Sequence, residues 1–323
     1  MSVLVTGAAG FIGSHVSRAL LDRGEDVVGI DNMNDYYDVA LKEARLATLS
    51  GRDRFRFERV DIADRDAIAD LARRFGDLDR IVHLAAQAGV RHSLTHPHDY
   101  TRANVEGQLN MLELARHLDG LKHLVYASSS SVYGGNEDVP FSVEDRVDNP
   151  ISLYAATKRS GELMARCYSH LYGMPATGLR FFTVYGPWGR PDMSAYIFTK
   201  AIVERRPIRV FNHGDMKRDF TFIDDIVKGV LACLDRPPDD TPPHRLYNLG
   251  NHRSEPLMRF IAQIEQALQL KAEIVFEDMQ PGDVKETYAD IEASRTDLDF
   301  EPSTAIDEGI PRFVDWFRDY HEL

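Results

Sequence analysis

The sequence feature that most constrains the fold is a glycine-rich turn near the first residues. An apolar, strand-like run from Val3 to Thr6 leads directly into Gly7, Gly10 and Gly13, and a helical pattern begins at Phe11. Gly7 permits a tight turn, Gly10 lets the backbone approach a pyrophosphate, and Gly13 allows the helix to pack closely. The helix N-terminus would then face the phosphate charge. This unit predicts a dinucleotide-binding site.

The pattern of the first half predicts a sheet around this turn. Apolar strand-like runs alternate with amphipathic helical stretches, as in a parallel sheet wrapped by helices. The predicted strands are Val3–Thr6, Asp26–Ile30, Arg54–Val60, Asp79–Ala85, His123–Ser128 and Ala176–Arg180. The predicted helices are Phe11–Arg23, Ala63–Phe75, Pro97–Leu118 and Leu153–Tyr172. With right-handed crossovers, this order predicts an α/β fold with a Rossmann-type, doubly wound parallel sheet.

Carboxylates at the ends of two strands indicate which dinucleotide binds. Asp31 ends the second strand, where it can accept hydrogen bonds from the hydroxyls of the adenosine ribose. The same charge would repel a 2′-phosphate, and no Arg follows immediately, so NAD is favoured over NADP. Asp61, at the end of the third strand, is placed to meet the adenine amino group. A purely structural turn is the alternative, but these features together favour NAD.

The alternation of predicted strands and helices ends after Tyr185, where frequent prolines divide the chain into shorter segments. We predict a NAD-binding Rossmann domain at residues 1–180. Residues 181–323 are expected to form mainly a smaller, mixed α/β substrate-binding lobe. Some elements, at about 222–248, would return to the Rossmann core, beginning with a helix at Phe222–Leu234.

Tyr154 and Lys158 are the candidate catalytic pair. They lie four residues apart in a predicted helix and therefore share a face. A free tyrosine, with a pKa of about 10, is a poor base near neutrality. A neighbouring ammonium would stabilise the phenolate, so that Tyr154 could remove a hydroxyl proton as hydride leaves the same carbon. The serines at 128–131, after a predicted strand, would hold the reacting oxygen.

Charge and composition exclude several other classes. With 38 basic and 51 acidic side chains the net charge is −13, which argues against a nucleic-acid partner. We see neither a signal peptide nor an apolar run that could span a membrane, so no membrane partner is expected. The two cysteines, Cys167 and Cys233, have no framework spacing and are expected to be free thiols in the cytoplasm.

No metal is expected either. His92, His96 and His98 cluster in the sequence. They lack the spacing of a metalloprotease helix, and no Cys joins them.

In the glycine turn, the serine run and the Tyr154–Lys158 pair, the chain resembles the extended short-chain dehydrogenase/reductase family of NAD-dependent epimerases and dehydratases. The shared strings, which extend over essentially the whole chain, are Thr6–Gly13, His83–Ala86, Asn104, Ser128–Gly134, and Tyr154 with Lys158. The resemblance implies tightly held NAD, a nucleotide-sugar substrate, and an acid/base Tyr154 assisted by Ser129 and Lys158. The cofactor contacts that it implies are Gly7, Gly10, Phe11, Ile12, Gly13, Asp31, Asn32, Asp61, Ile62, Leu84, Ala85, Ala86, Gln87, Asn104, Tyr154 and Lys158.

Longer strings resemble the UDP-glucuronate 4-epimerases in particular. They are Asp31–Asp38, His83–Arg91 and Leu179–Met193. Galactose-type epimerases usually carry Asn where Thr183 stands, which favours the glucuronate branch. The resemblance implies that NAD⁺ takes hydride from carbon 4 while Tyr154 takes the hydroxyl proton. The 4-keto sugar would then rotate and receive hydride on its other face, giving UDP-galacturonate.

The same resemblance implies how a UDP-sugar substrate is held. Ser129, Ser130, Thr183 and Arg190 would fix the sugar carboxylate, which would keep the β-keto acid intermediate from losing carbon dioxide. Arg218 and Asp283 match positions around the UDP phosphates and ribose, and Arg91, in one of the shared strings, is also expected to contact the substrate. A homodimer through the predicted helices Pro97–Leu118 and Leu153–Tyr172 is also implied.

Several alternative functions remain, some of them enzymes that also use hydride transfer and one a protein without catalytic activity. Dehydratases of the family carry an Asp-Glu pair after the strand-end Thr, and related decarboxylases keep a Glu there. Here Ser130 and Ser131 occupy that stretch, so elimination has no obvious proton donor. A 4-epimerase of another UDP-hexose is a further alternative. A dinucleotide-binding sensor on the same fold would be expected to have lost Tyr154 or Lys158.

Overall fold

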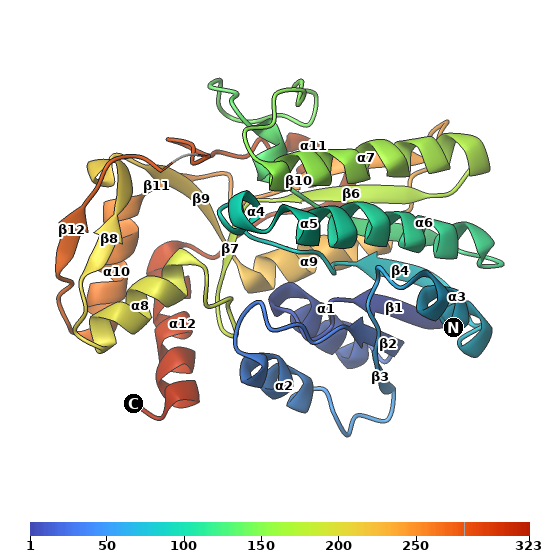
Figure 1. The fold of residues 1–323 in the computed structure, drawn as a ribbon, viewed down its shortest axis with the longest axis horizontal. Coiled ribbons are helices and arrows are strands. Elements are labelled where there is room, and N and C mark those ends of the chain that lie inside the picture. Colours follow the sequence, from blue (N-terminus) through green and yellow to red (C-terminus); the bar gives the residue numbers. More distant parts are fainter. Residues whose placement is uncertain (281) are drawn as a thin grey trace.

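The structure, a computed structural model that describes residues 1–280 and 282–323, is built around a seven-stranded parallel sheet (Figure 1). The strand order is β10-β6-β5-β4-β1-β2-β3. The strands are β1 (Ser2–Thr6), β2 (Asp26–Asp31), β3 (Phe55–Arg59), β4 (Leu78–His83), β5 (His123–Ser129), β6 (Ala176–Phe181) and β10 (His244–Leu249). The predicted Rossmann-type, doubly wound parallel sheet is confirmed.

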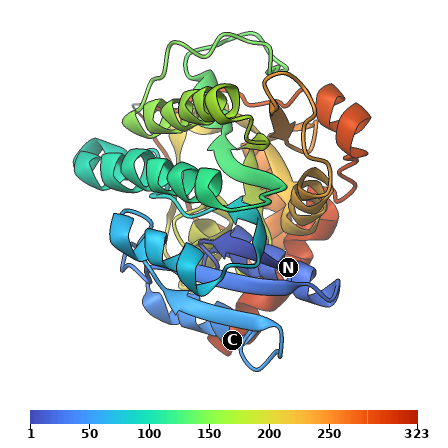
Figure 2. The same ribbon diagram turned by 90° about the vertical axis from the view of Figure 1, so that its right-hand side faces the viewer.

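Helices cover both faces of this sheet because successive side chains of a strand point to opposite sides. Val3 and Val5 of β1 belong to one buried cluster with α1 and α9, whereas Leu4 belongs to a second cluster with α3, α6 and α7. In Figure 2 the green helices α6 and α7 lie side by side on one side of the strands. These helices are α1 (Phe11–Asp22), α3 (Arg65–Arg74), α6 (Gly107–His117), α7 (Leu153–Tyr172) and α9 (Ile223–Leu234).

The direction in which the sheet is built reverses between β1 and β4. From β1 the chain proceeds to β2 and β3 on one side, and β4, β5 and β6 follow on the other. In open parallel sheets, ligands bind outside the carboxyl ends of the strands at such a switch point. The fold therefore places the glycine turn, the end of β2 and the end of β4 around one crevice.

The second half of the chain adds two small sheets and then returns to the large one. One small sheet has the order β11-β9-β7, and the other pairs β12 with β8. The chain returns through α9, which packs on α1, and through β10, which pairs with β6 along its whole length. The remaining elements are β7 (Thr183–Tyr185), α8 (Ser194–Val203), β8 (Ile208–Val210), β9 (Lys217–Phe222), β11 (Ser254–Pro256), α10 (Leu257–Leu268), β12 (Ile274–Phe276), α11 (Glu292–Leu298) and α12 (Ile306–His321).

The predicted helix Pro97–Leu118 is helical almost throughout, but its hydrogen-bond pattern changes. It begins as α5 (Pro97–Tyr100), continues as a π-helical segment (Thr101–Glu106) and only then becomes α6. Such wide turns often lie at functional sites because they redirect a side chain. The short elements nearby are α2 (Val39–Ala47), α4 (His92–Thr95) and the 3₁₀ turns Ser130–Tyr133 and Phe211–Gly214.

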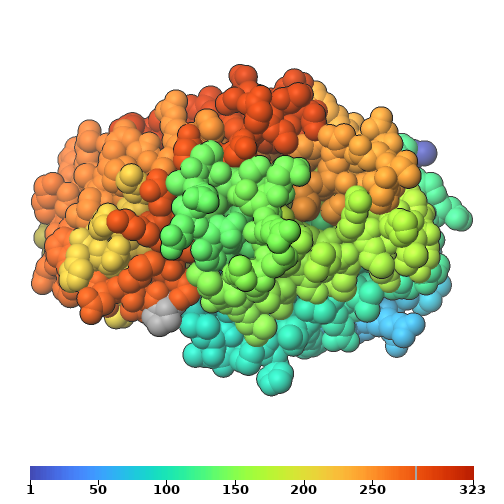
Figure 3. Space-filling view, turned by 90° about the horizontal axis from the view of Figure 1, so that it is seen from above, coloured from blue at the N-terminus to red at the C-terminus, as the bar shows by residue number. Residues whose placement is uncertain are grey.

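The loop between β5 and α7 joins the two halves of the molecule. Phe141 forms a bridge with Ala289, and the Phe141 amide donates to the Tyr288 carbonyl at 2.7 Å. Seen from above, the green surface of this loop lies against the orange-red surface of the last third of the chain (Figure 3). Backbone contacts therefore join this loop to residues 288–289, far along the chain.

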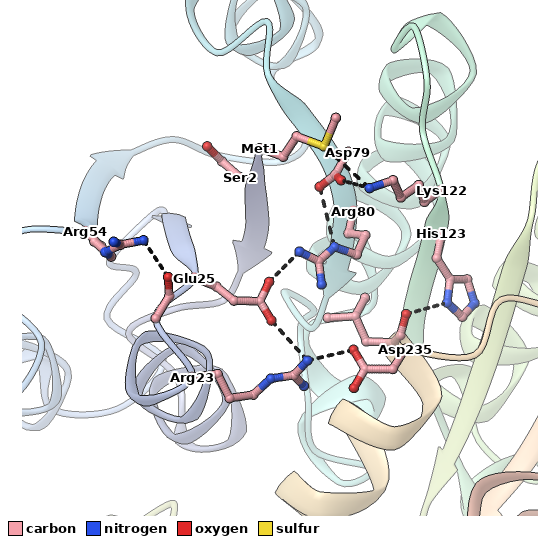
Figure 4. A network of polar contacts seen from close by, with 12 residues as sticks. Met1, Ser2, Arg23, Glu25, Arg54, Asp79, Arg80, Lys122, His123 and Asp235 are labelled. Carbon is pink, nitrogen blue, oxygen red and sulfur yellow. Dashed lines mark hydrogen bonds and ion pairs between the residues drawn. The ribbon is translucent and has the colours of Figure 1, made fainter.

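Ion pairs connect the amino-terminal ends of neighbouring strands (Figure 4). The crevice lies at the opposite, carboxyl ends of the strands. Arg80 on β4 pairs with Glu25 before β2 and with Asp79, and Asp79 also accepts from Lys122 at 2.7 Å. Glu25 and Asp79 are largely buried, with side chains 15% and 6% exposed, so solvent screens these pairs less than fully exposed ones. No helix among residues 1–280 and 282–323 is long and apolar enough to cross a membrane.

Candidate active site

A single cavity of about 1020 Å³ extends from the glycine turn to residues of the second half of the chain, among them Arg218 and Asp283. Every residue predicted to contact cofactor or substrate lines this cavity, with the exception of Asn104. The sequence therefore located residues that are far apart in the chain and close together in space.

The glycine turn is shaped by contacts that a side chain would prevent. Gly7 has φ +72°, and its amide donates to the Ile30 carbonyl at 2.8 Å. A Cβ on Gly10 would lie 2.9 Å from the Gly7 carbonyl oxygen, and one on Gly13 would lie only 2.0 Å from the same atom. The first turn of α1 thus folds directly over Gly7, and its residues form the wall of the cavity.

Asp31 lies at the carboxyl end of β2, buried at the cavity wall. Its Oδ1 accepts from the Met33 amide at 2.9 Å. The Nζ of Lys42, on α2, lies 3.6 Å from Asp31 Oδ1 and donates to Asn34 Oδ1 at 2.8 Å. Burial lowers the pKa of Lys42, and the Asp31 carboxylate opposes this effect. Lys42 was missed in the sequence, where an isolated lysine on an amphipathic helix gives no signal.

Asp61 follows β3 and makes two local contacts. Its Oδ1 accepts from the Ala63 amide and its Oδ2 from Arg102, both at 2.9 Å. Together with Ile62, it lines the cavity beside the end of β3. The carboxylate is thus held in place by the chain on two sides.

Asn104 does not line the cavity but supports a segment that does. It is buried in the π-helical segment, where its Oδ1 accepts from the Gln87 amide at 2.8 Å. Its Nδ2 donates to the Gln87 carbonyl at 3.0 Å and to Thr157 Oγ1 at 3.1 Å. Asn104 therefore fixes the backbone of the loop after β4, which includes Leu84, Ala85 and Ala86, onto the start of α7.

The start of α7 places Tyr154 and Lys158 at the cavity. Ser152 caps this helix, since its Oγ accepts from the Ala155 amide at 3.1 Å, and Gly173 ends the helix in the left-handed conformation. Tyr154 lies in the first turn, and Lys158 one turn later donates from Nζ to the Ala127 carbonyl at 2.9 Å. Both side chains line the cavity beside Ser129, the last residue of β5.

The electrostatic setting of Tyr154 differs from the expected one. Burial raises its pKa, while the contact with Ser129 and the positive charge of Arg190 act in the opposite direction. Lys158 was expected to provide this stabilisation, but its ammonium is engaged with a backbone carbonyl. Burial lowers the pKa of Lys158 to about 8, against the effect of the Glu162 carboxylate. Ser129 and Arg190 are therefore the groups that most favour a phenolate in this structure.

A buried ion pair between Glu162 and Arg180 holds α7 on the sheet. Glu162, one turn beyond Lys158, accepts from Arg180 Nε at 2.8 Å, and both side chains are 1% exposed. Ser128 Oγ donates to the same carboxylate at 2.6 Å. Removing one partner of such a pair leaves an uncompensated buried charge, at a cost of about 3–5 kcal/mol. This pair fixes α7 against β5 and β6.

The polar groups opposite Tyr154 come from β5 and from the segment around β7. Ser130 follows β5, and Thr183 begins β7. Arg190, in the loop between β7 and α8, donates from Nε to Asp192 Oδ1 at 3.0 Å. All of them line the cavity, so that the chain places two hydroxyls and a guanidinium on the wall near the phenol.

A second polar cluster lies at the end of the cavity away from the glycine turn. Arg91, from the loop after β4, donates to Asp283 Oδ2 at 2.9 Å and stacks on Phe211 at 4.6 Å. Arg218, on β9, donates to the carbonyl of Lys285 at 3.1 Å. Burial lowers the pKa of Arg218, and Asp283 opposes the effect. The structure thus joins three predicted residues that are up to 192 positions apart in the chain.

Comparison with known proteins gives a consistent family. Residues 3–250 match the model of the NAD dependent epimerase/dehydratase family. A probable UDP-glucuronate 4-epimerase from Rhizobium meliloti is 45% identical, over 98% of this chain and 97% of that protein. UDP-glucuronate 4-epimerase 1 from Arabidopsis thaliana is 46% identical, over 99% of this chain and 77% of its own.

A solved structure is similar over the full length. The UDP-glucuronic acid 4-epimerase from Bacillus cereus, in complex with UDP-glucuronic acid and NAD, is 34% identical and superimposes with a TM-score of 0.92. The alignment covers 99% of this chain and 100% of that one. With the family match over most of its length, and with relatives far above 30% identity, this chain belongs to the NAD-dependent epimerase/dehydratase family.

Proposed function

We propose that this protein interconverts UDP-glucuronate and UDP-galacturonate by NAD-dependent inversion at carbon 4. The observation that carries the proposal is the shared cavity. It combines a glycine turn for a dinucleotide, Tyr154 for proton transfer, and a wall of Thr183 and Arg190 for an acidic sugar. The names of the relatives from Rhizobium and Arabidopsis, and the ligands of the Bacillus protein, support the same assignment.

The residues at the switch point fit NAD. A Cβ on Gly7 would lie 2.9 Å from the Ala85 amide nitrogen, and one on Gly10 or Gly13 would meet the Gly7 carbonyl, so glycines make possible the turn that would hold a pyrophosphate. Asp31 ends β2, as expected for an acceptor of ribose hydroxyls. We assign the pyrophosphate to residues 7–13 and the adenosine to Asp31, Asn32, Asp61 and Ile62. The residues 84–87 and Lys158 would flank the nicotinamide half. When bound, NAD accepts a hydride from carbon 4 and returns it.

Tyr154 is the proposed acid/base. It would take the proton of the 4-hydroxyl as the sugar is oxidised and give it back as the 4-keto sugar is reduced. Ser129 would share that proton, and the positive charge of Arg190 would favour the phenolate. Proton transfer by a positioned side chain contributes about 10²–10⁴-fold to rate.

The sugar carboxylate is assigned to Thr183, Ser130 and Arg190. Decarboxylation needs the bond to the carboxylate carbon to lie perpendicular to the plane of the 4-keto group. A carboxylate held by several donors would resist that alignment. The UDP moiety is assigned to Arg91, Arg218 and Asp283, at the boundary with the C-terminal lobe. Residues 181–323 would therefore supply mainly the substrate side, and residues 1–180 the cofactor side.

The direct test incubates the purified protein with UDP-glucuronate and follows the products by NMR without added reductant. We expect UDP-galacturonate, with no net NADH and little pentose. UDP-pentose as the main product would instead identify a decarboxylase. Turnover of UDP-glucose or UDP-N-acetylglucosamine alone would identify another hexose epimerase. Bound NAD without turnover of any of these sugars would favour a dinucleotide sensor.

Substitution of Thr183 tests the carboxylate assignment. Thr183→Val keeps the size of the side chain and removes its hydroxyl. We expect the preference for UDP-glucuronate over UDP-glucose, measured as a ratio of kcat/KM, to fall about tenfold to a hundredfold, because one hydrogen bond to a charged group is lost. Thr199→Val, at a buried position on α8 outside the cavity, is the control. An unchanged ratio in Thr183→Val would remove Thr183 from the carboxylate site.

A homodimer through α6 and α7 is part of the proposal. The two helices lie side by side (Figure 2), and they expose Leu109, Leu163 and Leu171, which are 41%, 55% and 60% accessible. Leu163→Glu would place a charge in the contact between two copies. We expect this variant to elute as a monomer in size-exclusion chromatography with light scattering. Val275→Glu, on the exposed strand β12, should leave the mass unchanged. A dimer that persists in Leu163→Glu would contradict this interface.

We also infer a reducing, cytoplasmic compartment. Cys167 is exposed and Cys233 is buried, and both are free thiols. Burial raises the pKa of Cys233 to about 12, so its thiol is unreactive, and two unpaired cysteines are typical of reducing surroundings.

A further inference from the structure

The guanidinium of Arg190 is oriented by a carboxylate on its own loop. Arg190 donates from Nε to Asp192 Oδ1 at 3.0 Å and from Nη2 to Asp192 Oδ2 at 2.5 Å. The two side chains are 23% and 28% exposed, and both line the cavity. A bidentate pair fixes the plane of the guanidinium. The pair alone does not fix where the two side chains lie relative to the rest of the cavity, because both belong to the same short loop.

A tyrosine from the cofactor side of the cavity holds this pair. Tyr36, in the loop between β2 and α2, donates its hydroxyl hydrogen to Asp192 Oδ2 at 3.0 Å, across 156 positions of sequence. Its ring packs edge-on against His92 at 4.8 Å. A Cβ on Gly89, which has φ +99°, would lie 2.4 Å from the Tyr36 hydroxyl, so the ring fits closely above this glycine. Burial raises the pKa of Tyr36 to about 12, and the phenol therefore remains a donor.

The same region of the chain also anchors the other end of the loop. Arg45, on α2, is 1% exposed and donates from Nη2 to the Trp188 carbonyl at 2.7 Å and to the Gly189 carbonyl at 3.3 Å. Arg45 thus holds the backbone before Arg190, while Tyr36 holds the side chains that follow. Of the two contacts, only that of Tyr36 acts on the charged groups that face the cavity.

We propose that Tyr36 is a positioning residue that sets the selectivity of the site for an acidic sugar, acting on Arg190 through Asp192. This inference rests on the proposed function, in which Arg190 binds the sugar carboxylate. Asp192 carries a negative charge on the cavity wall, which would repel that carboxylate if it were free to turn inward. The Tyr36 hydroxyl donates a hydrogen bond to Asp192 Oδ2. This bond keeps the carboxylate directed at Arg190 and away from the ligand.

The test compares Tyr36→Phe with the wild-type protein in the NAD-loaded state. The substitution keeps the ring and removes only the hydroxyl. Calorimetry would give the Kd of UDP-glucuronate and of UDP-glucose, which has the same nucleotide but no carboxylate. We expect binding of UDP-glucuronate to weaken about fivefold to tenfold, which is less than the full effect of a hydrogen bond to a charged group because Tyr36 acts through Asp192, and that of UDP-glucose to change less than about twofold.

Two further variants separate positioning from a general structural effect. Tyr196→Phe, which removes a hydroxyl that contacts His321 at 2.7 Å outside the cavity, should change neither affinity. In an Asp192→Ala background, Tyr36→Phe should have no further effect on UDP-glucuronate, because the carboxylate through which Tyr36 acts is gone. Bound NAD and the melting temperature are recorded for each variant.

The outcomes distinguish the inference from the function on which it rests. An equal loss for both sugars, or a loss that persists in the Asp192→Ala background, would overturn the role of Tyr36. A wild-type preference for UDP-glucuronate that Tyr36→Phe leaves intact would overturn it as well, while the proposed function stands. A wild-type protein with no preference between the two sugars would contradict the proposed function itself, and the inference with it.

Discussion

Tyr154→Phe will abolish interconversion of UDP-glucuronate and UDP-galacturonate while the protein keeps its fold and its cofactor. The substitution removes the only hydroxyl of this side chain, so no proton can be taken from or returned to the sugar through it. We expect kcat to fall about 10³-fold, within the range for loss of a positioned acid/base. The measurement is product formation by NMR, with bound NAD determined from its absorbance after denaturation.

The matched control for Tyr154→Phe lies on the same helix. Tyr168, also on α7, donates its hydroxyl hydrogen to Glu113 outside the cavity. Tyr168→Phe should retain activity within about a factor of three, because it removes a hydroxyl that does not face the cavity. If Tyr154→Phe kept more than a tenth of the wild-type rate, another group would have to serve as the acid/base.

Gly13→Ala is the second substitution with a large expected effect. The new Cβ would lie 2.0 Å from the Gly7 carbonyl oxygen and 2.7 Å from the Gly7 carbonyl carbon, far inside van der Waals contact. Neither atom can move without opening the turn between β1 and α1. We expect the protein to lose bound NAD and to be destabilised by about 3 kcal/mol, at the upper end for overpacking. Cofactor content and denaturant unfolding measure the two effects.

A glycine in open space provides the comparison for Gly13→Ala. Gly76, between α3 and β4, has no atom within 4 Å of its would-be Cβ. Gly76→Ala should therefore leave both cofactor content and stability unchanged within about 0.5 kcal/mol. Normal NAD content in Gly13→Ala would show that the turn can relax without loss of the site.

Much of the Rossmann core could be predicted because its signals are local. The strands β1 to β6 and the helices α1, α3 and α7 occupy nearly the predicted residues, since runs of apolar residues and helical periodicity act within a few positions. The assignment to the epimerase/dehydratase family is confirmed, because its strings around Gly7 and Tyr154 are long and specific. The roles of individual site residues stay predictions.

The parts that could not be predicted depend on contacts between distant segments. Nothing local to Tyr36 or Asp192 indicates that they meet, because 156 residues separate them. Lys42 is similar, since only the folded α2 brings its ammonium to Asp31. Asn104 was expected at the cofactor, but the π-helical segment turns it toward the backbone of Gln87. Lys158 was expected to lower the pKa of Tyr154, but its ammonium donates to the Ala127 carbonyl. Ser129 and Arg190 are the groups that lower the pKa of Tyr154 in this structure.

The position of β10 has a consequence for how the protein is made. Because β10 hydrogen-bonds to β6 over residues 176–181, the sheet cannot be finished before residue 249 has left the ribosome. Until then a nascent chain with six strands presents the unpaired backbone of β6 as an open edge, where another strand can add. At about 5–20 residues per second, translation of the intervening segment takes several seconds. During that interval the open edge of β6, and not the stability of the finished molecule, determines how far the chain is exposed to pairing with other strands.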